Sequence, residues 1–368
     1  MNDFRIHAPC LFGIEGVAAD EFRRLGFENV QTSDGRVSFT GDAYTLARAN
    51  LWSRYTERIL LEVCSFRADT FDALFEGVKA ADWSSFLPAD AVFPVDGYSI
   101  RSRLASIPDC QRIIKKAIVS SLQKSHNVSW FPESGQTYRV RFSILGDEVC
   151  VCLDSSGDGL HKRGYREKSN AAPLRETLAC AMVDLARYRG RDPFLDPFCG
   201  SGTIPIEAAL KATNRAPGQY RRFDAEKWAF MPADAFTAAR TEALDLIRRD
   251  PIDIEGRDID PACVELAREN ARKAGVGGLI RFTQADASRT KLYDFTGTIV
   301  TNPPYGERLD DLETARRTVK FFSRQINSAA KLYVISSDEQ FEQAFGRKAA
   351  KKRKLYNGMI RCNLYMYF

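Results

Sequence analysis

Hydrophobic residues in the first half of the chain recur at two spacings, which predict short strands mixed with helices. Alternating apolar and polar positions predict strands over 4–8, 28–32, 35–40, 56–68, 98–104, 137–145 and 148–154. Apolar positions three and four apart predict helices over 16–26, 42–52, 70–83 and 108–126. This part reads as small α+β units, and it contains no glycine-rich strand-to-helix turn of a nucleotide site.

From about residue 175 onward, strands and helices alternate regularly. A helix over 174–190 precedes strand-to-helix units over 194–210 and 252–275, and further strands are predicted over 280–288, 297–301 and 331–337. Such alternation predicts a parallel, doubly wound sheet. An asparagine–glycine turn at 357–358 predicts an antiparallel pair at its edge. Residues 155–174 are rich in glycine, serine and charge, and are expected to form a linker between the two halves.

Composition and charge narrow the class of protein only a little. The 368 residues are 44% apolar, which suits two or three globular domains, and 53 basic against 48 acidic residues give a net charge of +5. The start has no basic stretch followed by an apolar run, and nowhere do about 18 apolar residues follow one another. We therefore expect a cytoplasmic protein with no membrane partner.

The cysteines and histidines indicate neither disulfides nor a metal site. Nine cysteines include no Cys-x-x-Cys pair, and the three histidines, His7, His126 and His161, stand far apart in the sequence. We therefore expect reduced thiols and no bound metal.

A glycine-rich loop, "DPFCGSGT" over 196–203, follows a short apolar strand and opens a helix. Gly200 and Gly202 allow a ligand to approach the backbone, and the following helix presents free N–H groups. The loop lacks the lysine of a P-loop, and Pro205 replaces the third glycine of the dinucleotide pattern. A nucleoside-like ligand without a pyrophosphate fits better, although a glycine turn without a ligand remains an alternative.

Two acidic residues end the next two predicted strands. Asp258 stands where doubly wound sheets hold ribose hydroxyls, and Asp286 stands where a carboxylate can accept from an adenine amino group. Asp260 is expected to cap the helix that begins at Pro261. Each acid alone is a common helix cap, but a glycine loop and two acids on successive strands indicate a nucleoside site.

The motifs "DPFCGSGT", "DID" (258–260), "QADA" (284–287) and "NPPYG" (302–306), in this order, resemble the S-adenosylmethionine-dependent class I methyltransferases that act on exocyclic amino groups of bases. With "HKRGYREKSNAAPLRETLA" and the upstream α+β region, nearly the whole chain resembles the THUMP-domain RNA methyltransferases, often first labelled N6-adenine-specific DNA methylases. The resemblance implies a doubly wound, Rossmann-like α/β methyltransferase domain with an N-terminal α+β RNA-binding region. The implied division is a ferredoxin-like segment over 1–57, a THUMP domain over 58–154, a linker over 155–174 and a methyltransferase domain over 175–368 with an insertion over 214–250.

The resemblance also implies S-adenosyl-L-methionine as cofactor and assigns the residues that hold it. These are Asp196, Phe198, Cys199, Gly200, Gly202, Thr203, Asp258, Ile259, Asp286, Ala287 and Asn302. Cys199 is expected to be a small loop residue, because no cysteine accompanies "NPPY" as carbon-5 methylation would require. In the insertion, Phe223 and Trp228 are expected to anchor the segment to the core.

The stretch "NPPY", Asn302 to Tyr305, suits methylation of an aromatic amine. Such an amine is a poor nucleophile, so the site must accept hydrogen bonds from its N–H groups. The side-chain oxygen of Asn302 and the carbonyl of Pro303 can supply two acceptors. Pro303 and Pro304 fix the turn and remove backbone donors, and Tyr305 can stack on a base outside its helix.

Three basic stretches are candidate contacts to the RNA backbone. They contribute Arg112, Lys115 and Lys116 from a helix face, Lys162, Arg163 and Arg166 from the linker, and Lys351 and Lys352 from the C-terminal tail. The stretch "HKRGYR" over 161–166 could instead line the entry of the cofactor, and an ordinary solvated surface is the alternative for each stretch.

The primary hypothesis is an RNA methyltransferase that forms 2-methylguanosine, with 23S ribosomal RNA favoured over transfer RNA on family resemblance. An N6-adenine DNA methylase is the alternative enzyme, since "NPPY" suits adenine equally, but the upstream α+β region argues against it. An RNA-binding or assembly protein without activity is the third possibility, against which the complete set of motifs argues. Some ribosomal enzymes of the family carry a second methyltransferase domain, which this sequence does not include.

Overall fold

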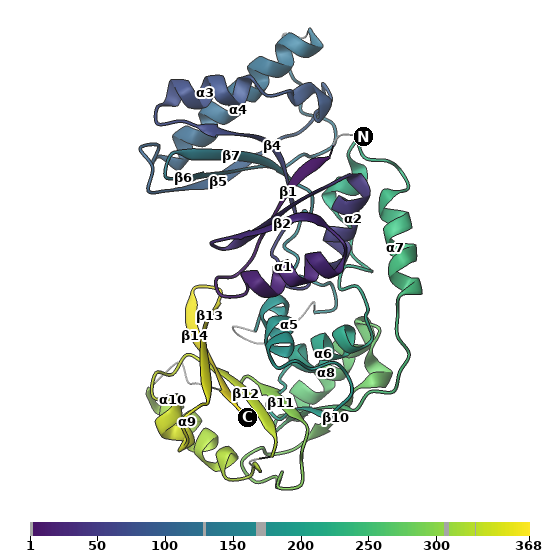
Figure 1. Cartoon of the computed structure of the whole chain (residues 1–368), viewed down its shortest axis with the longest axis vertical. Coiled ribbons are helices and arrows are strands. Elements are labelled where there is room, and N and C mark those ends of the chain that lie inside the picture. The colour runs from purple at the N-terminus through teal and green to yellow at the C-terminus, as the bar shows by residue number, and fades with distance from the viewer. Residues whose placement is uncertain (1–2, 128–129, 167–173, 305–308, 328) are drawn as a thin grey trace.

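The computed structural model describes residues 3–127, 130–166, 174–304, 309–327 and 329–368. Two seven-stranded sheets, one in each half of the chain, are arranged along the long axis of the molecule (Figure 1). Among the described residues, no helix combines the length and apolar character needed to cross a bilayer.

The N-terminal sheet has the strand order β2-β3-β1-β4-β7-β6-β5. Its strands are β1 (Phe4–Pro9), β2 (Glu28–Ser33), β3 (Arg36–Gly41), β4 (Leu60–Arg67), β5 (Val95–Ile100), β6 (Val140–Leu145) and β7 (Glu148–Asp154). Helices α1 (Glu15–Arg24) and α2 (Ala43–Trp52) contact β2 and β3, while α3 (Phe71–Lys79) and α4 (Ile107–His126) contact β4 and β5. The predicted α+β character of this half is confirmed.

This sheet runs across the expected boundary between residues 57 and 58. Strand β1 pairs with β3 over six residues but with β4 over only two, His7 with Leu60 and Ile6 with Leu61. The first α+β unit and the second therefore share one sheet through a short joint.

One predicted strand of this half is displaced. The prediction placed it over 98–104, whereas β5 ends at Ile100 and pairs in parallel with β6. The chain turns away at Arg101, which has φ of +52°. The hydroxyl of Ser102 and the N–H of Arg103 both donate to the carboxylate of Asp147, at 2.7 and 2.9 Å. These bonds fix a turn that apolar alternation along the chain could not indicate.

The C-terminal sheet has the order β10-β9-β8-β11-β12-β14-β13, and its first five strands are parallel. Its strands are β8 (Phe194–Asp196), β9 (Ile254–Asp258), β10 (Arg281–Gln284), β11 (Thr298–Thr301), β12 (Lys331–Ser336), β13 (Lys351–Asn357) and β14 (Ile360–Tyr367). Its helices are α5 (Glu176–Leu185), α6 (Thr203–Ala212), α7 (Ala235–Asp245), α8 (Pro261–Lys273), α9 (Leu309–Ser323) and α10 (Phe341–Phe345). Helices α5, α6 and α8 lie on one side of the sheet and α9 and α10 on the other (Figure 1), so the predicted doubly wound sheet with an antiparallel edge is confirmed.

The described part of the expected linker is packed rather than solvated. Ser155 and Ser156 are fully buried, and each exchanges a hydrogen bond with the side chain of Asn50 on α2, at 2.8 and 2.7 Å. Leu160 and Tyr165 are also buried. Much of this stretch is polar because buried backbone and side-chain groups bond to one another there, while Asp158, Lys162 and Gly164 are exposed. Residues 167–173 lie outside the described residues.

The insertion connects the two halves of the molecule. Phe223 and Trp228 are both 2% exposed, and the Trp228 ring stacks on Tyr138, two residues before β6, with centroids 5.6 Å apart. Helix α7 lies beside α2 in Figure 1, where the Arg48 guanidinium and the Glu242 carboxylate pair at 2.9 Å. The prediction that Phe223 and Trp228 anchor the insertion is confirmed.

Candidate active site

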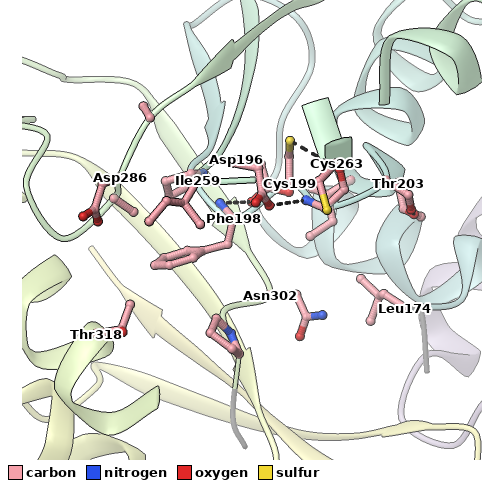
Figure 2. Close-up of a pocket in the computed structure, with 18 of the residues that line it drawn as sticks. Leu174, Asp196, Phe198, Cys199, Thr203, Ile259, Cys263, Asp286, Asn302 and Thr318 are labelled. Carbon is pink, nitrogen blue, oxygen red and sulfur yellow. Dashed lines mark hydrogen bonds between the residues drawn. The ribbon is translucent and has the colours of Figure 1, made fainter. Parts of the chain in front are cut away.

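A cavity of about 540 Å³ opens at the carboxyl ends of β8, β9, β10 and β11. The cavity lies between β8 and β11. The helix after β8 and the helix after β11 lie on opposite sides of the sheet, and ligands of doubly wound folds usually bind at such a point. Figure 2 shows Asp286 and Ile259 at one end, Thr203 and Leu174 at the other, and Asn302 across the cavity from Asp196 and Cys199. Of the eleven residues that the resemblance assigned to the cofactor, all except Gly202 line this cavity.

The two loop glycines have different physical roles. Gly200 has φ of +50°, and a Cβ atom there would meet no atom within 4 Å, so its open side faces the cavity. Gly202 has φ of +84°, and a Cβ atom there would lie 2.9 Å from the Cβ atom of Ala267 on α8. Gly202 therefore allows α6 and α8 to pack closely. The prediction that it faces a ligand is wrong.

The carboxylate of Asp258 ties the glycine loop to the end of β9. One oxygen accepts from the N–H of Gly200 at 2.8 Å and the other from the N–H of Asp260 at 3.0 Å. Each carboxylate oxygen can accept a second hydrogen bond, so the side chain is fixed and still able to bind a ligand. Asp260 accepts from the N–H of Ala262 at 2.8 Å, as its predicted capping role requires.

Asp196 forms the buried floor of the cavity. Its Oδ1 atom accepts from the Thr301 hydroxyl at 2.7 Å and from the N–H of Phe198 at 3.1 Å. Burial raises the pKa of Asp196 to about 7, and the nearby charge of Asp258 adds to this, although the two hydrogen bonds act in the opposite direction. Asp196 is thus a carboxyl group that changes charge near neutral pH.

At the other end of the cavity, an acid and an apolar side chain lie together. The Oδ1 atom of Asp286 accepts from the N–H and the hydroxyl of Ser288, at 2.9 and 2.6 Å. Ile259 is 63% exposed beside it and presents an aliphatic surface to the cavity. An acceptor next to an exposed aliphatic surface suits an aromatic ring that carries an amino group.

Asn302 follows β11, and its side-chain oxygen has no hydrogen-bond partner among the described residues. Oδ1 is buried and accepts no hydrogen bond from any part of the chain that the structure describes. Buried acceptors are rarely left unpaired, so this atom is suited to a donor on a ligand. Pro304 also lines the cavity, whereas Pro303 is buried and is not one of the lining residues, so the acceptor role of its carbonyl stays a prediction. Tyr305, predicted to stack on a base, lies outside the described residues.

Cys199 is unsuited to nucleophilic attack. Burial raises the pKa of its thiol well above the ordinary value, and the charges of Asp196 and Asp258 raise it further. Because the thiolate is the reactive form, this cysteine is inert at neutral pH.

Eight cavity residues were not predicted as site residues. Three of them, Pro197, Ser201 and Ala285, lie within the quoted motifs, and the other five, Leu174, Ile204, Cys263, Ser288 and Thr318, lie outside the strand-end motifs. Leu174 ends the expected linker and Thr318 lies in the middle of α9, so neither belongs to a strand-end motif. Helical spacing places Thr318 on a defined face of α9, but only the packing of that helix shows which face meets the cavity.

The basic residues predicted to contact RNA divide into buried and exposed groups. Arg163 is 5% exposed and donates to the carbonyls of Ser53, Arg54 and Leu160 at 3.1, 2.6 and 2.8 Å, so the prediction of phosphate contact is wrong for it. The Arg166 side chain is 9% exposed, donates to the Thr203 hydroxyl at 3.1 Å and pairs with Glu176 at 3.0 Å. It holds the cavity wall, and phosphate contact is wrong for it too.

The other predicted RNA contacts remain at the surface. Arg112, Lys115 and Lys116 line one shallow groove on α4, where Lys115 pairs with Glu133 at 2.7 Å. Lys162 pairs with Asp158 at 3.3 Å, and Lys351 and Lys352 are exposed on the edge strand β13. These six side chains are accessible to RNA, and their contact with it stays a prediction.

Comparison with protein families gives three matches along the chain. Residues 163–366 match the family described as "RMKL-like, methyltransferase domain", residues 5–60 the "RlmL ferredoxin-like domain", and residues 68–154 the THUMP domain. The first match alone covers more than half of the chain.

Individual relatives agree with these matches. The chain is 46% identical to "Putative RNA methyltransferase YpsC" of Bacillus subtilis, over 100% of this chain and 97% of that protein. It is 33% identical to "Ribosomal RNA large subunit methyltransferase K/L" of Psychromonas ingrahamii, over 98% of this chain but only 49% of that protein. The solved structure of "SMU.472, a putative methyltransferase complexed with SAH" is 39% identical, with a TM-score of 0.91 over 100% of this chain and 98% of that one.

Proposed function

The chain belongs to the RMKL-like methyltransferase family, with a ferredoxin-like and a THUMP domain before the methyltransferase domain, and from this we propose that it methylates the 2-amino group of a guanosine in RNA. The observation that carries the proposal is the buried, unpartnered Oδ1 atom of Asn302 at the edge of the cavity, among the described residues. An exocyclic amine brings the N–H donor that this acceptor lacks.

The enzyme uses S-adenosylmethionine, which supplies an activated methyl group when bound. The cavity fits this cofactor in size and in chemistry, and a methyltransferase relative has been solved with SAH. Asp286 and the exposed face of Ile259 would hold the adenine, and Asp258 the ribose hydroxyls. The open side of Gly200 would face the remainder of the cofactor. Asp258 serves this purpose well because its bonds to two backbone N–H groups already fix its position.

Orientation of the amine is the main contribution of the "NPPY" turn. The amine lone pair is delocalised into the base, so the nitrogen must be turned toward the methyl donor while its N–H groups are accepted elsewhere. Asn302 Oδ1 and the carbonyl of Pro303 are the two proposed acceptors. Positioning of this kind can be worth roughly 7–11 kcal/mol of the barrier. Asn302 thus acts by binding and orienting, without taking a proton.

We favour 23S ribosomal RNA as the substrate, because a relative over 98% of this chain is named as a methyltransferase of the large-subunit ribosomal RNA. The chain spans about half of that relative, so the likeness concerns only that portion. The N-terminal THUMP match supports RNA in preference to DNA as substrate.

Nucleoside mass spectrometry of ribosomal and transfer RNA, from cells with and without the gene, tests this proposal. We expect one 2-methylguanosine to disappear from the large-subunit ribosomal RNA and to return when the purified protein and S-adenosylmethionine are added. Loss from transfer RNA alone would keep the reaction and change the substrate. Unchanged 2-methylguanosine in both pools, or loss of N6-methyladenosine instead, would reject the proposed product.

A further inference from the structure

A compact group of nitrogen, sulfur and oxygen atoms lies in the N-terminal sheet, in the half of the molecule away from the active site. The ligand atoms of His7 on β1 and of Cys150 and Cys152 on β7 all lie within 4.8 Å of one another, and all three residues are buried. The two sulfur atoms are 3.5 Å apart. Glu62 on β4 completes the group, with Oε2 2.5 Å from Nε2 of His7 and 3.8 Å from the sulfur of Cys150.

Strand register explains why these residues meet. His7 lies opposite Leu60 in the pairing of β1 with β4, and Glu62 lies opposite Cys152 in the pairing of β4 with β7. Residues directly opposite one another share a face of the sheet, as do residues two apart on a strand. His7, Glu62, Cys150 and Cys152 therefore all point to the same face. We expected no metal because the histidines and cysteines stand far apart in the sequence. Strand pairing nevertheless brings His7, Cys150 and Cys152 together in space.

We propose that His7, Cys150, Cys152 and Glu62 form a binding site for one zinc ion. Two thiolates and an imidazole are ligands that zinc prefers, and a carboxylate commonly takes a fourth position. In a tetrahedral site with Zn–S bonds of about 2.3 Å, the two sulfurs lie roughly 3.8 Å apart, close to the separation observed here. His7 and Glu62 would have to separate by somewhat less than ~1 Å to admit the ion, since zinc–nitrogen and zinc–oxygen bonds are about 2.0–2.2 Å long.

The surroundings of His7 match those of a metal-bound histidine. Its Nδ1 atom lies 2.7 Å from the hydroxyl of Ser38 on β3, which lies directly opposite it in the sheet. Metal-bound histidines almost always bond through their second nitrogen to a fixed group, which sets the tautomer and the ring orientation. If Nδ1–H donates to Ser38, a zinc ion can take the place of the proton that Nε2 shares with Glu62 in the metal-free protein.

The ligand atoms already interact with one another. The sulfur of Cys150 contacts both the sulfur of Cys152 and the carboxylate of Glu62, and Glu62 also bonds to His7. A zinc ion would displace the protons that these bonds share.

A cavity gives an ion access to this site, and a bound ion would stabilise the short pairing of β1 with β4. His7, Cys150 and Cys152 line a cavity of about 310 Å³, through which a small ion can reach them. Two arginines of the same cavity, Arg58 and Arg141, pair with Asp154 at 2.5 and 3.4 Å, and Arg141 also pairs with Asp96, so two carboxylates oppose the two positive charges. The ligands come from β1, β4 and β7, so the ion would reinforce the joint where β1 and β4 pair over only two residues.

Cobalt(II) substitution in the full-length protein tests the proposal. Reduced and chelator-treated protein is titrated with Co²⁺, and Zn²⁺ is then added in competition with a chromophoric chelator. We expect a thiolate-to-cobalt charge-transfer band that saturates at one equivalent and disappears when zinc is added. Cys150→Ser, Cys152→Ser and His7→Gln should each weaken zinc binding by about 100-fold or more, given that loss of even an outer-shell partner costs 10–100-fold.

Cys64→Ser is the matched control, because Cys64 lies on β4 like Glu62, but a register shift between them places Cys64 opposite Val151 and outside the cluster. The Cys64→Ser variant should bind both metals like the wild type.

If the ligand variants fold poorly, the wild type alone still tests the proposal, since zinc should raise its melting temperature relative to chelator-treated protein. Absence of the charge-transfer band in the reduced wild type, or its persistence in a Cys150→Ser, Cys152→Ser double variant, would overturn the proposal. Rapid formation of a Cys150–Cys152 disulfide that excludes zinc would overturn it as well.

Discussion

Asn302→Ala separates the proposed role of this residue from a structural one. In the free enzyme the Oδ1 atom is buried without a partner among the described residues, and an unsatisfied buried polar atom costs about 1–3 kcal/mol. Alanine removes that cost, and the shortened side chain opens into the cavity of about 540 Å³ without creating a closed void. We therefore expect the melting temperature of the free protein to stay the same or to rise slightly.

Catalysis should respond in the opposite way. Removal of one preorganised polar partner of a developing charge costs about 10²–10³ in kcat, or roughly 2.7–4 kcal/mol. Cofactor affinity should change by less than about threefold, at a cost under ~0.7 kcal/mol, because the proposed polar contacts to the cofactor lie at Asp258 and Asp286. The expected pattern is therefore a large loss of kcat with unchanged cofactor binding and unchanged stability.

Single-turnover methyl transfer to RNA from cells lacking the gene gives the rate, calorimetric titration gives the affinity for S-adenosylmethionine, and thermal unfolding gives the stability. Asn302→Asp is the matched variant, since it keeps the acceptor oxygen and should retain more activity than Asn302→Ala. A kcat within tenfold of the wild type, or equal activity of the two variants, would refute the acceptor role. A loss of cofactor affinity beyond tenfold would make Asn302 a cofactor ligand instead.

Other predictions concern the cavity floor, the ribose end and the buried arginine. Asp258→Asn should weaken S-adenosylmethionine by about 10–100-fold in calorimetry, since hydrogen bonds to a charged group are worth about 1.5–3 kcal/mol; unchanged affinity would show that Asp258 only fixes the loop. The pKa of Asp196 rises from 3.8 to about 7 on folding, so the folded protein favours the protonated carboxyl. The contribution of this group to the free energy of unfolding is therefore complete below about pH 4 and is lost as pH rises through 7. Asp196→Asn should accordingly flatten the melting temperature between pH 4 and 8, and an unaltered profile would contradict the raised pKa. Arg163→Met should lower the free energy of unfolding by about 3–5 kcal/mol, because it leaves the buried carboxylate of Glu207 without its cation. Nε of Arg163 lies 3.5 Å from Oε1 of Glu207. If instead the variant melts normally and its RNA affinity depends less on salt, Arg163 contacts phosphate after all.

The sequence by itself determined the order and type of nearly all the elements and the position of the cavity. Apolar periodicity is a local property, and the carboxyl ends of parallel strands necessarily share one edge of a sheet. The residues Asp196, Asp258, Asp286 and Asn302 could therefore be assigned to one site from strand-end motifs alone.

Only the tertiary structure decided what each polar residue in the remaining segments contacts. The stretch after β7 has the composition of a linker, yet Arg163 is buried there against carbonyls contributed by distant loops. Gly202 looks equivalent to Gly200 in the motif, but the approach of α8 gives it a packing role.

The register of the N-terminal sheet brings His7 to Cys150 and Cys152 across more than 140 residues of chain. Strand pairing and helix docking depend on residues far apart in the sequence. A pattern read along the chain can indicate which face is buried, but it cannot say what lies opposite.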